Sequence, residues 1–186
     1  MSQALPRKPR ILQTKTGKLA IVASKYNETY SDSLVENVIS ELSEYLPETR
    51  VDLVRVPGAF EIPVTIKALL ELERPICVIA LGVIIKGETS HADLVARNVT
   101  DALQQLALEY RTPVIHEVLL VEDEAQAHMR CIGDKINRGT EAARTAAASR
   151  TRRTARGPSS ARGPPRGAYG RPLNRPRHHP PPPRPP

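Results

Sequence analysis

The sequence predicts an α/β protein of three layers, α/β/α, in which helices cover both faces of a four-stranded parallel sheet. Short apolar runs alternate four times with longer segments whose apolar residues recur at helical spacing, and the connections between them are short. The apolar runs are almost uninterrupted, which is typical of strands that are buried on both faces. The length of 186 residues allows one domain with a substantial core.

Four strands are predicted, each bounded by glycine, proline or polar residues. They are Leu19–Ser24, Val51–Val56, Ile76–Ile84 and Val114–Val121. The dipeptide Pro57-Gly58 closes the second strand, and Pro113 breaks the chain before the fourth.

Helices are predicted between and after these strands. They cover residues 30–46, 59–72, 92–110, about 122–132 and about 137–148. Ser31, Asp32 and Ser33 offer caps for the first helix. Pro63 is tolerated in the second because it falls in the first turn. On the third helix, Leu94 lies on one apolar stripe with Val95, Val99, Leu103, Leu106 and Ala107.

The basic charge of the chain is concentrated near its C-terminus. There are 27 Lys and Arg against 20 Asp and Glu, a net charge of +7, but ten of the arginines lie in residues 149–186, which contain no acid. Residues 1–148 therefore hold 17 basic and 20 acidic side chains. The predicted organisation is a flexible arm (1–17), an α/β domain (18–148) and a disordered tail (149–186), and a nucleic-acid partner is expected only through the tail.

Three interpretations of the tail stay open. Its Arg/Pro-rich composition has too few apolar residues to offset the entropy of ordering a core. It binds nucleic acid or another partner, or it is a passive extension, or it is a GC-rich region translated in a shifted reading frame. The abrupt change of composition inside the predicted last helix favours the shifted frame.

No secretory signal, membrane segment, metal site or cofactor is predicted. The N-terminus lacks an apolar core, and no apolar stretch approaches the ~20 residues that cross a bilayer. We therefore expect a cytoplasmic protein without a membrane partner. Cys77 and Cys131 lack metal-like spacing, and Cys77 lies in an apolar run, where a core position is expected.

Ligands of open α/β sheets bind beyond the carboxyl ends of the strands, near the point where the strand order reverses. Four segments follow these ends: "SKYNETY", "VPGAFEIP", "GVIIKGETSH" and "VEDEAQAHMR". All four contain residues that a plain turn does not need. This coincidence predicts a binding site at that edge of the sheet.

The third of these segments is suited to phosphate. Gly87, Glu88, Thr89 and Ser90 lie between a strand end and a helix start, where free backbone amides and the positive end of the helix dipole attract an anion. Helix capping alone would also explain the two hydroxyls. His91 falls in the first helical turn, where the dipole favours a neutral imidazole that can pass protons beside a bound phosphate.

The other exits offer groups for a flat heterocycle and its substituents. Tyr26 and Asn27 combine an aromatic face with an amide, although an ordinary loop asparagine is an equal alternative. Glu61, next to Phe60, either binds hydroxyls or an amine or simply favours a helix N-terminus. Arg130 is either a solvated charge or a clamp for a phosphate monoester.

With these residues, the chain resembles the lumazine synthase (6,7-dimethyl-8-ribityllumazine synthase) family over about residues 19–148. The resemblance depends on "VPGAFEIP", "ALGVIIKGETSH" and "NRGTEAA", in this order and approximate spacing. It implies a flavodoxin-like fold and the condensation of 5-amino-6-(D-ribitylamino)pyrimidine-2,4-dione with 3,4-dihydroxy-2-butanone 4-phosphate, without metal or redox cofactor. It also implies homo-oligomers, as pentamers or pentamer-based shells, with active sites shared between neighbouring subunits.

The resemblance assigns roles position by position. It places the pyrimidine and ribityl groups at Tyr26, Asn27, Ala59, Phe60, Glu61, Val83, Ile84, Ile85, His116 and Arg138. It places the phosphate at Gly87, Glu88, Thr89 and Arg130, and it makes His91 the proton-transfer residue. His116 stands where the family often has phenylalanine, so the wall is more polar here. Arg138 stands where many members have lysine.

Two other classes of function stay open. A flavodoxin-like module would bind a flavin or a phosphate without catalysis, and it gives His91 no role. A scaffold or nucleic-acid-binding protein would act through the tail. Its salt-dependent binding would be lost on truncation after Ala148.

Overall fold

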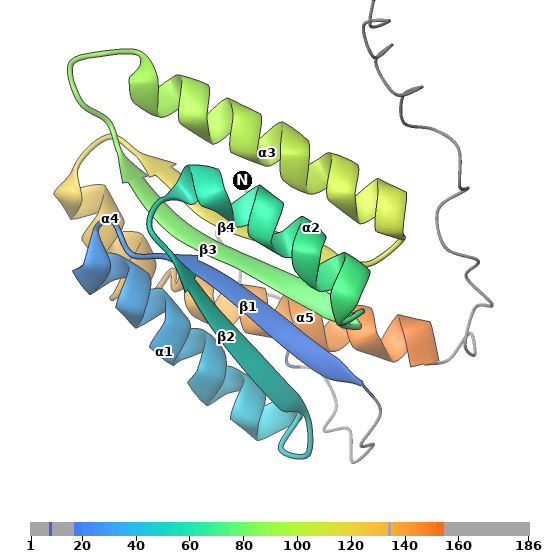
Figure 1. Ribbon diagram of the computed structural model, residues 1–186. Helices are drawn as coiled ribbons and strands as arrows, with labels where there is room; N and C mark the ends of the chain where they lie inside the picture. The colour runs from blue at the N-terminus through green and yellow to red at the C-terminus, as the bar shows by residue number, and fades with distance from the viewer. Residues whose placement is uncertain (1–7, 9–16, 134, 155–186) are drawn as a thin grey trace, which may run out of the picture.

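The computed structural model describes residue 8, residues 17–133 and residues 135–154. Most of the predicted arm and of the predicted tail therefore lies outside the described residues. Within them, the chain forms a four-stranded sheet with helices on both faces (Figure 1). The predicted three-layer α/β class is confirmed.

All four predicted strands are present, and each lies within one residue of its predicted bounds. They are β1 (Lys18–Ser24), β2 (Arg50–Val56), β3 (Cys77–Ile85) and β4 (Val114–Val121). Neighbouring strands pair in parallel, in the order β2-β1-β3-β4. The chain adds β2 on one side of β1 and β3 on the other, so the strand order reverses between β1 and β3.

Helices cover the sheet on both sides. They are α1 (Glu28–Tyr45), α2 (Ile62–Leu72), α3 (His91–Tyr110), α4 (Glu124–Cys131) and α5 (Arg138–Thr154), with a 3-10 turn, η1 (Ala59–Glu61), before α2. In Figure 1, α2 and α3 lie on one face, and α1, α4 and α5 lie on the other. No helix in the described part of the chain combines the length and the apolar character needed to cross a bilayer.

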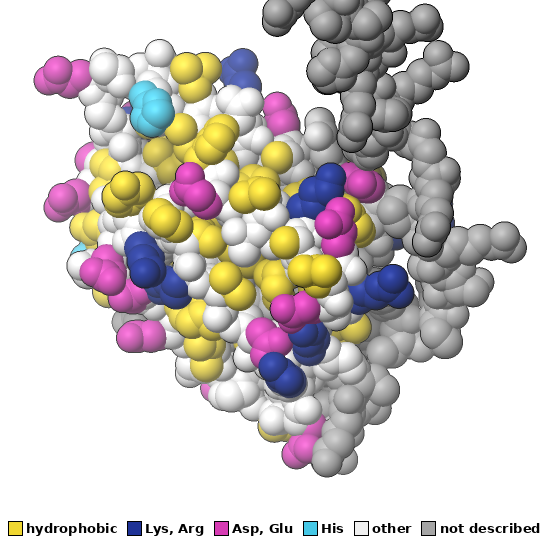
Figure 2. Space-filling view, viewed as in Figure 1, with side chains coloured by type: hydrophobic (Ala, Val, Ile, Leu, Met, Phe, Trp, Pro, Cys, Tyr) yellow, Lys and Arg dark blue, Asp and Glu magenta, His cyan; other side chains and the backbone are white. Residues whose placement is uncertain are grey.

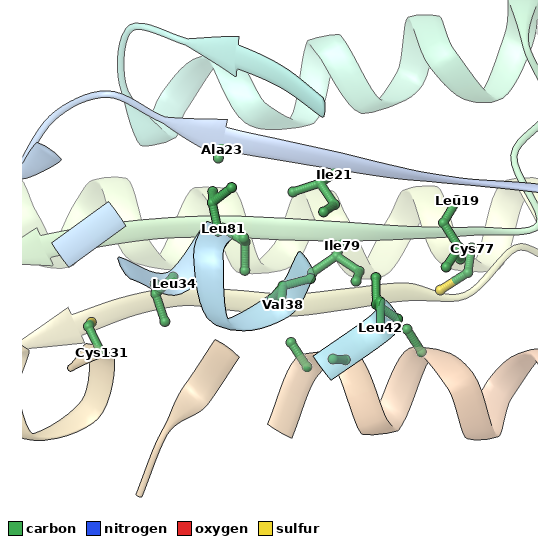
Figure 3. Close-up of a cluster of buried hydrophobic side chains, with 14 of the residues drawn as sticks. Leu19, Ile21, Ala23, Leu34, Val38, Leu42, Cys77, Ile79, Leu81 and Cys131 are labelled. Atoms are coloured by element: carbon green, nitrogen blue, oxygen red, sulfur yellow. The ribbon is translucent and has the colours of Figure 1, made fainter. Parts of the chain in front are cut away.

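The continuous apolar runs are explained by two cores, one on each face. Successive residues of a strand point to opposite faces. Leu19 and Ile21 therefore pack towards α1, whereas Ala20 and Val22 pack towards α2 and α3. Figure 3 shows the first core, where side chains of β1 and β3 meet those of α1 and α4. Cys77 is fully buried there, as predicted, and burial raises its pKa to about 12.

Helix α1 begins two residues before its predicted start. Asn27 precedes it in a left-handed conformation, with φ of 56°, and its carbonyl accepts the Ser31 amide. The predicted capping residues lie inside the helix and are used in tertiary contacts. Ser31 Oγ donates to the carbonyl of Ser24 at the end of β1, and Asp32 forms an ion pair with Arg55 of β2. The capping prediction was wrong because these contacts hold the helix against the strand ends.

The predicted second helix is divided into η1 and α2. Pro63 has no N–H group, so it cannot donate the bond to the Ala59 carbonyl that an α-helix would require. The Ile62 amide binds this carbonyl instead, in a 3-10 arrangement, and the α-helix starts at Ile62. The prediction of one continuous helix was wrong in its first turn, although Pro63 does lie at the start of α2 as expected.

Helix α5 begins after Asn137, whose side-chain oxygen accepts the Thr140 amide at 3.1 Å. It packs on α1 through small side chains, which allow the two helices to approach closely. The buried ones are Ala142, Ala143, Ala146 and Ala147. The helix continues to Thr154, six residues past the end that the composition predicted.

Candidate active site

The exits of β1 and β3 are joined by a side-chain hydrogen bond. Asn27 Nδ2 donates to the carbonyl oxygen of Val83 at 2.8 Å. These two strands flank the point where the strand order reverses, which is where the sequence predicted a ligand. The ring of Tyr26, next to Asn27, is 71% exposed. An aromatic face and a fixed amide therefore stand together at this edge of the sheet.

The exit of β2 packs against the same segment. The amides of Lys25 and Tyr26 both donate to the Pro57 carbonyl, at 3.1 and 3.2 Å. The Gly58 amide donates to Glu61 Oε2 at 2.9 Å. A Cβ atom on Gly58 would lie 3.0 Å from that oxygen and 3.1 Å from the Tyr26 ring. A side chain here would push the ring or the carboxylate away, so glycine permits their close approach.

An open hollow of about 380 Å³ lies between η1 and the first turns of α3. It is lined by Phe60 and by four residues of α3 at helical spacing, His91, Leu94, Val95 and Asn98. Phe60 is 63% exposed and Leu94 57%. Leu94 belongs to the predicted apolar stripe of α3, and its side of the helix faces η1 rather than the sheet. Figure 2 shows hydrophobic side chains spread over the face that α2 and α3 form.

The loop between β3 and α3 leaves its backbone accessible. Gly87, Glu88, Thr89 and Ser90 are exposed, and a Cβ atom on Gly87 would contact nothing within 4 Å. Ser90 precedes α3 without a side-chain hydrogen bond to the helix. Helix capping is therefore limited to a long contact of 3.5 Å between Thr89 Oγ1 and the His91 amide. Side chains of this turn therefore satisfy few of its backbone amides, and the start of a helix is an electrostatically suitable place for an anion.

Lys86 anchors the loop to its surroundings. Its amide donates to the Val121 carbonyl at 2.9 Å, and its Nζ lies 2.7 Å from Glu122 Oε1 and 3.7 Å from Asp93 Oδ1. The bond to Glu122 raises the pKa of Lys86. The sequence did not single out this residue, which ties the start of α3 to the end of β4.

Arg130 and Arg138 lie on the opposite face of the sheet from the hollow. Arg130 is in the last turn of α4, and Arg138 begins α5, where it is buried and paired with Glu141. The positive charges of both arginines favour the ionised form of Glu117 of β4. Burial raises the pKa of this half-buried carboxyl to about 7, although the two positive charges oppose the shift.

His116 lies in the middle of β4, four residues before the position that pairs with Ile84. Its Nε2 is 2.7 Å from Thr100 Oγ1 of α3, and its Nδ1 accepts the Val118 amide at 3.1 Å. Burial lowers the pKa of the ring. Within one chain, His116 is therefore about 13 Å along the strand from the exits, at roughly 3.3 Å for each residue.

The predicted site residues thus fall into two groups. The first surrounds the strand exits and the hollow: Tyr26, Asn27, Ala59, Phe60, Glu61, Val83, Ile84, Ile85, Gly87, Glu88, Thr89 and His91. The second, His116, Arg130 and Arg138, lies elsewhere on the chain. The hollow-lining residues of α3 other than His91 were not predicted, although their spacing from His91 was a usable signal. Glu117 was also not predicted. The one sequence signal for it is that an acidic residue stands inside a mostly apolar strand.

Comparisons with known proteins show the family of the chain. The family model described as 6,7-dimethyl-8-ribityllumazine synthase matches residues 16–153, which include every predicted site residue. The chain belongs to the 6,7-dimethyl-8-ribityllumazine synthase family. The resemblance found in the sequence is therefore confirmed.

Proteins named 6,7-dimethyl-8-ribityllumazine synthase are similar over most of their length. The one from Thermococcus onnurineus is 41% identical over 128 residues, 69% of this chain and 83% of that protein. The one from Bdellovibrio bacteriovorus is 41% identical over 129 residues, 68% of this chain and 70% of that protein. A Coxiella burnetii protein is 38% identical over 130 residues, 69% of this chain and 86% of its own length. In the described part of this family member, no cluster of His, Cys, Asp and Glu is arranged to hold a metal ion.

Proposed function

We propose that this protein condenses 5-amino-6-(D-ribitylamino)pyrimidine-2,4-dione with 3,4-dihydroxy-2-butanone 4-phosphate to 6,7-dimethyl-8-ribityllumazine, with release of phosphate and water. This is the penultimate step of riboflavin biosynthesis. The observation that carries the proposal is the hollow that His91 shares with Phe60, next to the exposed loop at the β3 exit, in a chain of this family. A binding module without catalysis would need no imidazole at that position.

The pyrimidine and its ribityl chain fit the first group of residues. The exposed Tyr26 ring stacks on the heterocycle, and Asn27 and the 59–61 segment contact the ribityl hydroxyls. The backbone of 83–85 presents its polar groups to the edge of the heterocycle. The bond from Asn27 to Val83 supports this placement, because it fixes the amide and the strand end relative to each other.

The phosphate of the second substrate binds the amides of 87–89 at the start of α3, with Arg130 as its guanidinium clamp. The substrate amine attacks the ketone and loses water to give an imine, phosphate then leaves, and the ring closes with loss of a second water. His91 moves protons in these steps. No step needs a strong nucleophile from the protein. The proximity of two bound substrates supplies much of the rate, up to roughly 7–11 kcal/mol in ideal cases.

The site is completed by a neighbouring copy of the chain. His116, Arg130 and Arg138 lie apart from the hollow, so they reach the substrates only across a subunit interface. The exposed apolar side chains of the α2 and α3 face support such an interface; they include Phe60, Val64, Leu94 and Leu108. The proposed assembly is a pentamer or a shell of pentamers, and the proposed location is the cytoplasm, which suits two free cysteines.

The direct test mixes the purified protein with both substrates and follows lumazine absorbance and released phosphate together. We expect the two products to appear in equal amounts. Tight flavin binding with neither substrate consumed would instead establish the non-catalytic module. A chain that ends at Thr154 should keep full activity, whereas a protein acting through its tail would lose its function. Truncation after Ala148 is unsuitable because it removes the last turns of α5.

Shared sites are tested by mixing two impaired variants. His91→Ala and Arg130→Ala each damage one half of a site. When they are unfolded together and reassembled, some interfaces combine two intact halves, so activity should return above that of either variant alone. Activity that stays at the level of the separate variants, in assemblies shown to be mixed by mass spectrometry, would contradict the shared site.

A further inference from the structure

His116 takes part in an ordered chain of hydrogen bonds that links β4 to α3. β4 is an edge strand, and edge strands leave alternate backbone amides without a partner strand. The Val118 amide donates to His116 Nδ1 at 3.1 Å. A nitrogen that accepts carries no proton, so the proton of the neutral ring is on Nε2. Nε2 therefore donates to Thr100 Oγ1 at 2.7 Å, and Thr100 donates its own proton to the Ala96 carbonyl at 2.8 Å.

These bonds favour one charge state of the ring as well as one tautomer. A second proton would be placed on Nδ1, directly against the Val118 N–H. Among the described residues, the charged neighbours are exposed or on the other face: Arg97 and Asp101, which flank Thr100 on α3, are exposed, and Glu117 points to the opposite face because side chains alternate along β4. The residues of β3 that pair beside His116 are apolar. Burial lowers the pKa of the ring in the same direction.

We propose that Thr100 is a positioning residue for the active site. Together with the Val118 amide, it holds His116 as a neutral ring protonated on Nε2. This ring serves as a flat, uncharged wall against the pyrimidine bound to a neighbouring copy. The role of the wall rests on the proposed function, whereas the fixed tautomer does not. His116 is a polar residue in the sequence, but its ring presents an aromatic surface in this arrangement. Its two nitrogens are already occupied within its own chain, so they do not compete for the substrate.

The tautomer is tested without substrate, by NMR of the protein with 15N-labelled histidines. The chain has five histidines, and the His116 signals are identified by their loss in His116→Phe. We expect an Nε2-protonated, neutral ring at about pH 6.5, where an unperturbed imidazole is half protonated. In Thr100→Val, the ring should populate both tautomers. A ring protonated on Nδ1, or one that titrates like an exposed histidine, would overturn the inference.

The kinetic test compares KM for the pyrimidine in single and double variants. Thr100→Val should raise this KM about fivefold, the effect of one lost hydrogen bond, and more at about pH 6 than at about pH 8, because the released ring can then be protonated. His116→Lys should raise KM at least about tenfold through its buried charge, and by more than His116→Phe, which keeps an uncharged aromatic ring. In the His116→Phe background, Thr100→Val should have no further effect.

Thr145→Val is the matched control, since Thr145 makes the same kind of bond within a helix, to the Glu141 carbonyl, without a histidine partner. Its KM should equal that of the wild type. Equal effects of Thr100→Val with and without His116 would mean that Thr100 acts only through the stability of α3, and the inference would fall while the proposed function stood. If the wild type itself made no lumazine, the proposed function would fall, and with it the role of the ring as a wall.

Discussion

Asn27 and Val83 are 56 residues apart in the chain, yet the Asn27 side chain donates to the Val83 carbonyl at 2.8 Å. The left-handed backbone at Asn27 turns the chain from β1 into α1 and leaves the amide free to reach β3. Asparagine is one of the few residues other than glycine that adopts this conformation readily. The same residue thus makes the turn and fixes the two strand exits that flank the proposed pyrimidine site.

Replacement of Asn27 should separate these two roles. Asn27→Gly keeps the backbone conformation but removes the side-chain bond, and KM for the pyrimidine should rise about fivefold. Asn27→Ala removes the same bond and adds backbone strain, so its free energy of unfolding should be about 1 kcal/mol lower than that of Asn27→Gly. Urea unfolding and steady-state kinetics measure the two effects. Equal stability of the two variants would mean that the left-handed turn relaxes.

Gly58→Ala should impair substrate binding more than folding. The new methyl group would lie 3.0 Å from Glu61 Oε2 and 3.1 Å from the Tyr26 ring, and both side chains are exposed enough to move. We expect a KM for the pyrimidine at least about tenfold higher, with a loss of stability of about 1 kcal/mol. Gly87→Ala is the comparison for sterics, because a methyl group there meets no atom of the chain within 4 Å. An unchanged KM in Gly58→Ala would refute the placement of the ring and the carboxylate beside the substrate.

His91 and Arg130 should have different kinetic signatures. His91→Ala should lower kcat about 10- to 100-fold, because other groups and water can replace part of the proton transfer. Arg130→Ala should mainly raise KM for the phosphorylated substrate, and Arg130→Lys should recover part of it, since lysine keeps the charge but not the planar fork. His128→Ala, an exposed histidine on α4, is the control. Unchanged kinetics in both site variants would rule out the site assignment.

Glu117 should make the stability of the protein depend on pH. Its pKa is about 7 in the folded chain against 4.5 ordinarily, so the folded state holds this proton more tightly than the unfolded state. Stability should therefore fall as the pH rises from about 4.5 to about 7, by up to roughly 3 kcal/mol from this group. Glu117→Gln cannot ionise. It should be more stable than the wild type at about pH 8 and similar to it at about pH 4.5.

Chemical denaturation at both pH values measures this difference. Glu109→Gln, at an exposed position of α3, controls for the change in net charge. A stabilisation by Glu117→Gln that is the same at both pH values would show that the effect comes from packing rather than from ionisation.

Both thiols should be unreactive in the folded protein. Cys77 and Cys131 are free and buried, and burial raises the pKa of each to about 12, so almost no thiolate is present near neutral pH. A thiol-specific chromogenic reagent at about pH 8 should therefore modify neither cysteine until the chain unfolds, and both in denaturant. Rapid modification of one thiol without denaturant would show that its helix opens locally.

The fold was largely predictable because its signals are local. The period of the apolar residues distinguishes strands from helices, and uninterrupted runs such as that of β3 indicate burial on both faces. The starts of α1 and α2 were predicted less well because they depend on other parts of the chain. Ser31 and Asp32 resemble helix caps in sequence, but the nearness of Ser24 and Arg55, which only the folded sheet creates, gives them stronger partners.

The candidate site was likewise predictable only in part. The sequence by itself determined the chemistry at each strand exit, because glycine, hydroxyl, imidazole and aromatic residues in "VPGAFEIP" and "GVIIKGETSH" need no structure to be recognised. Only the tertiary structure decided which of them meet. It joined Asn27 to Val83, placed Phe60 and His91 on one hollow, and left His116, Arg130 and Arg138 outside the lining of that hollow. The physical reason is that contacts between distant segments depend on strand order and helix packing, which no local pattern encodes.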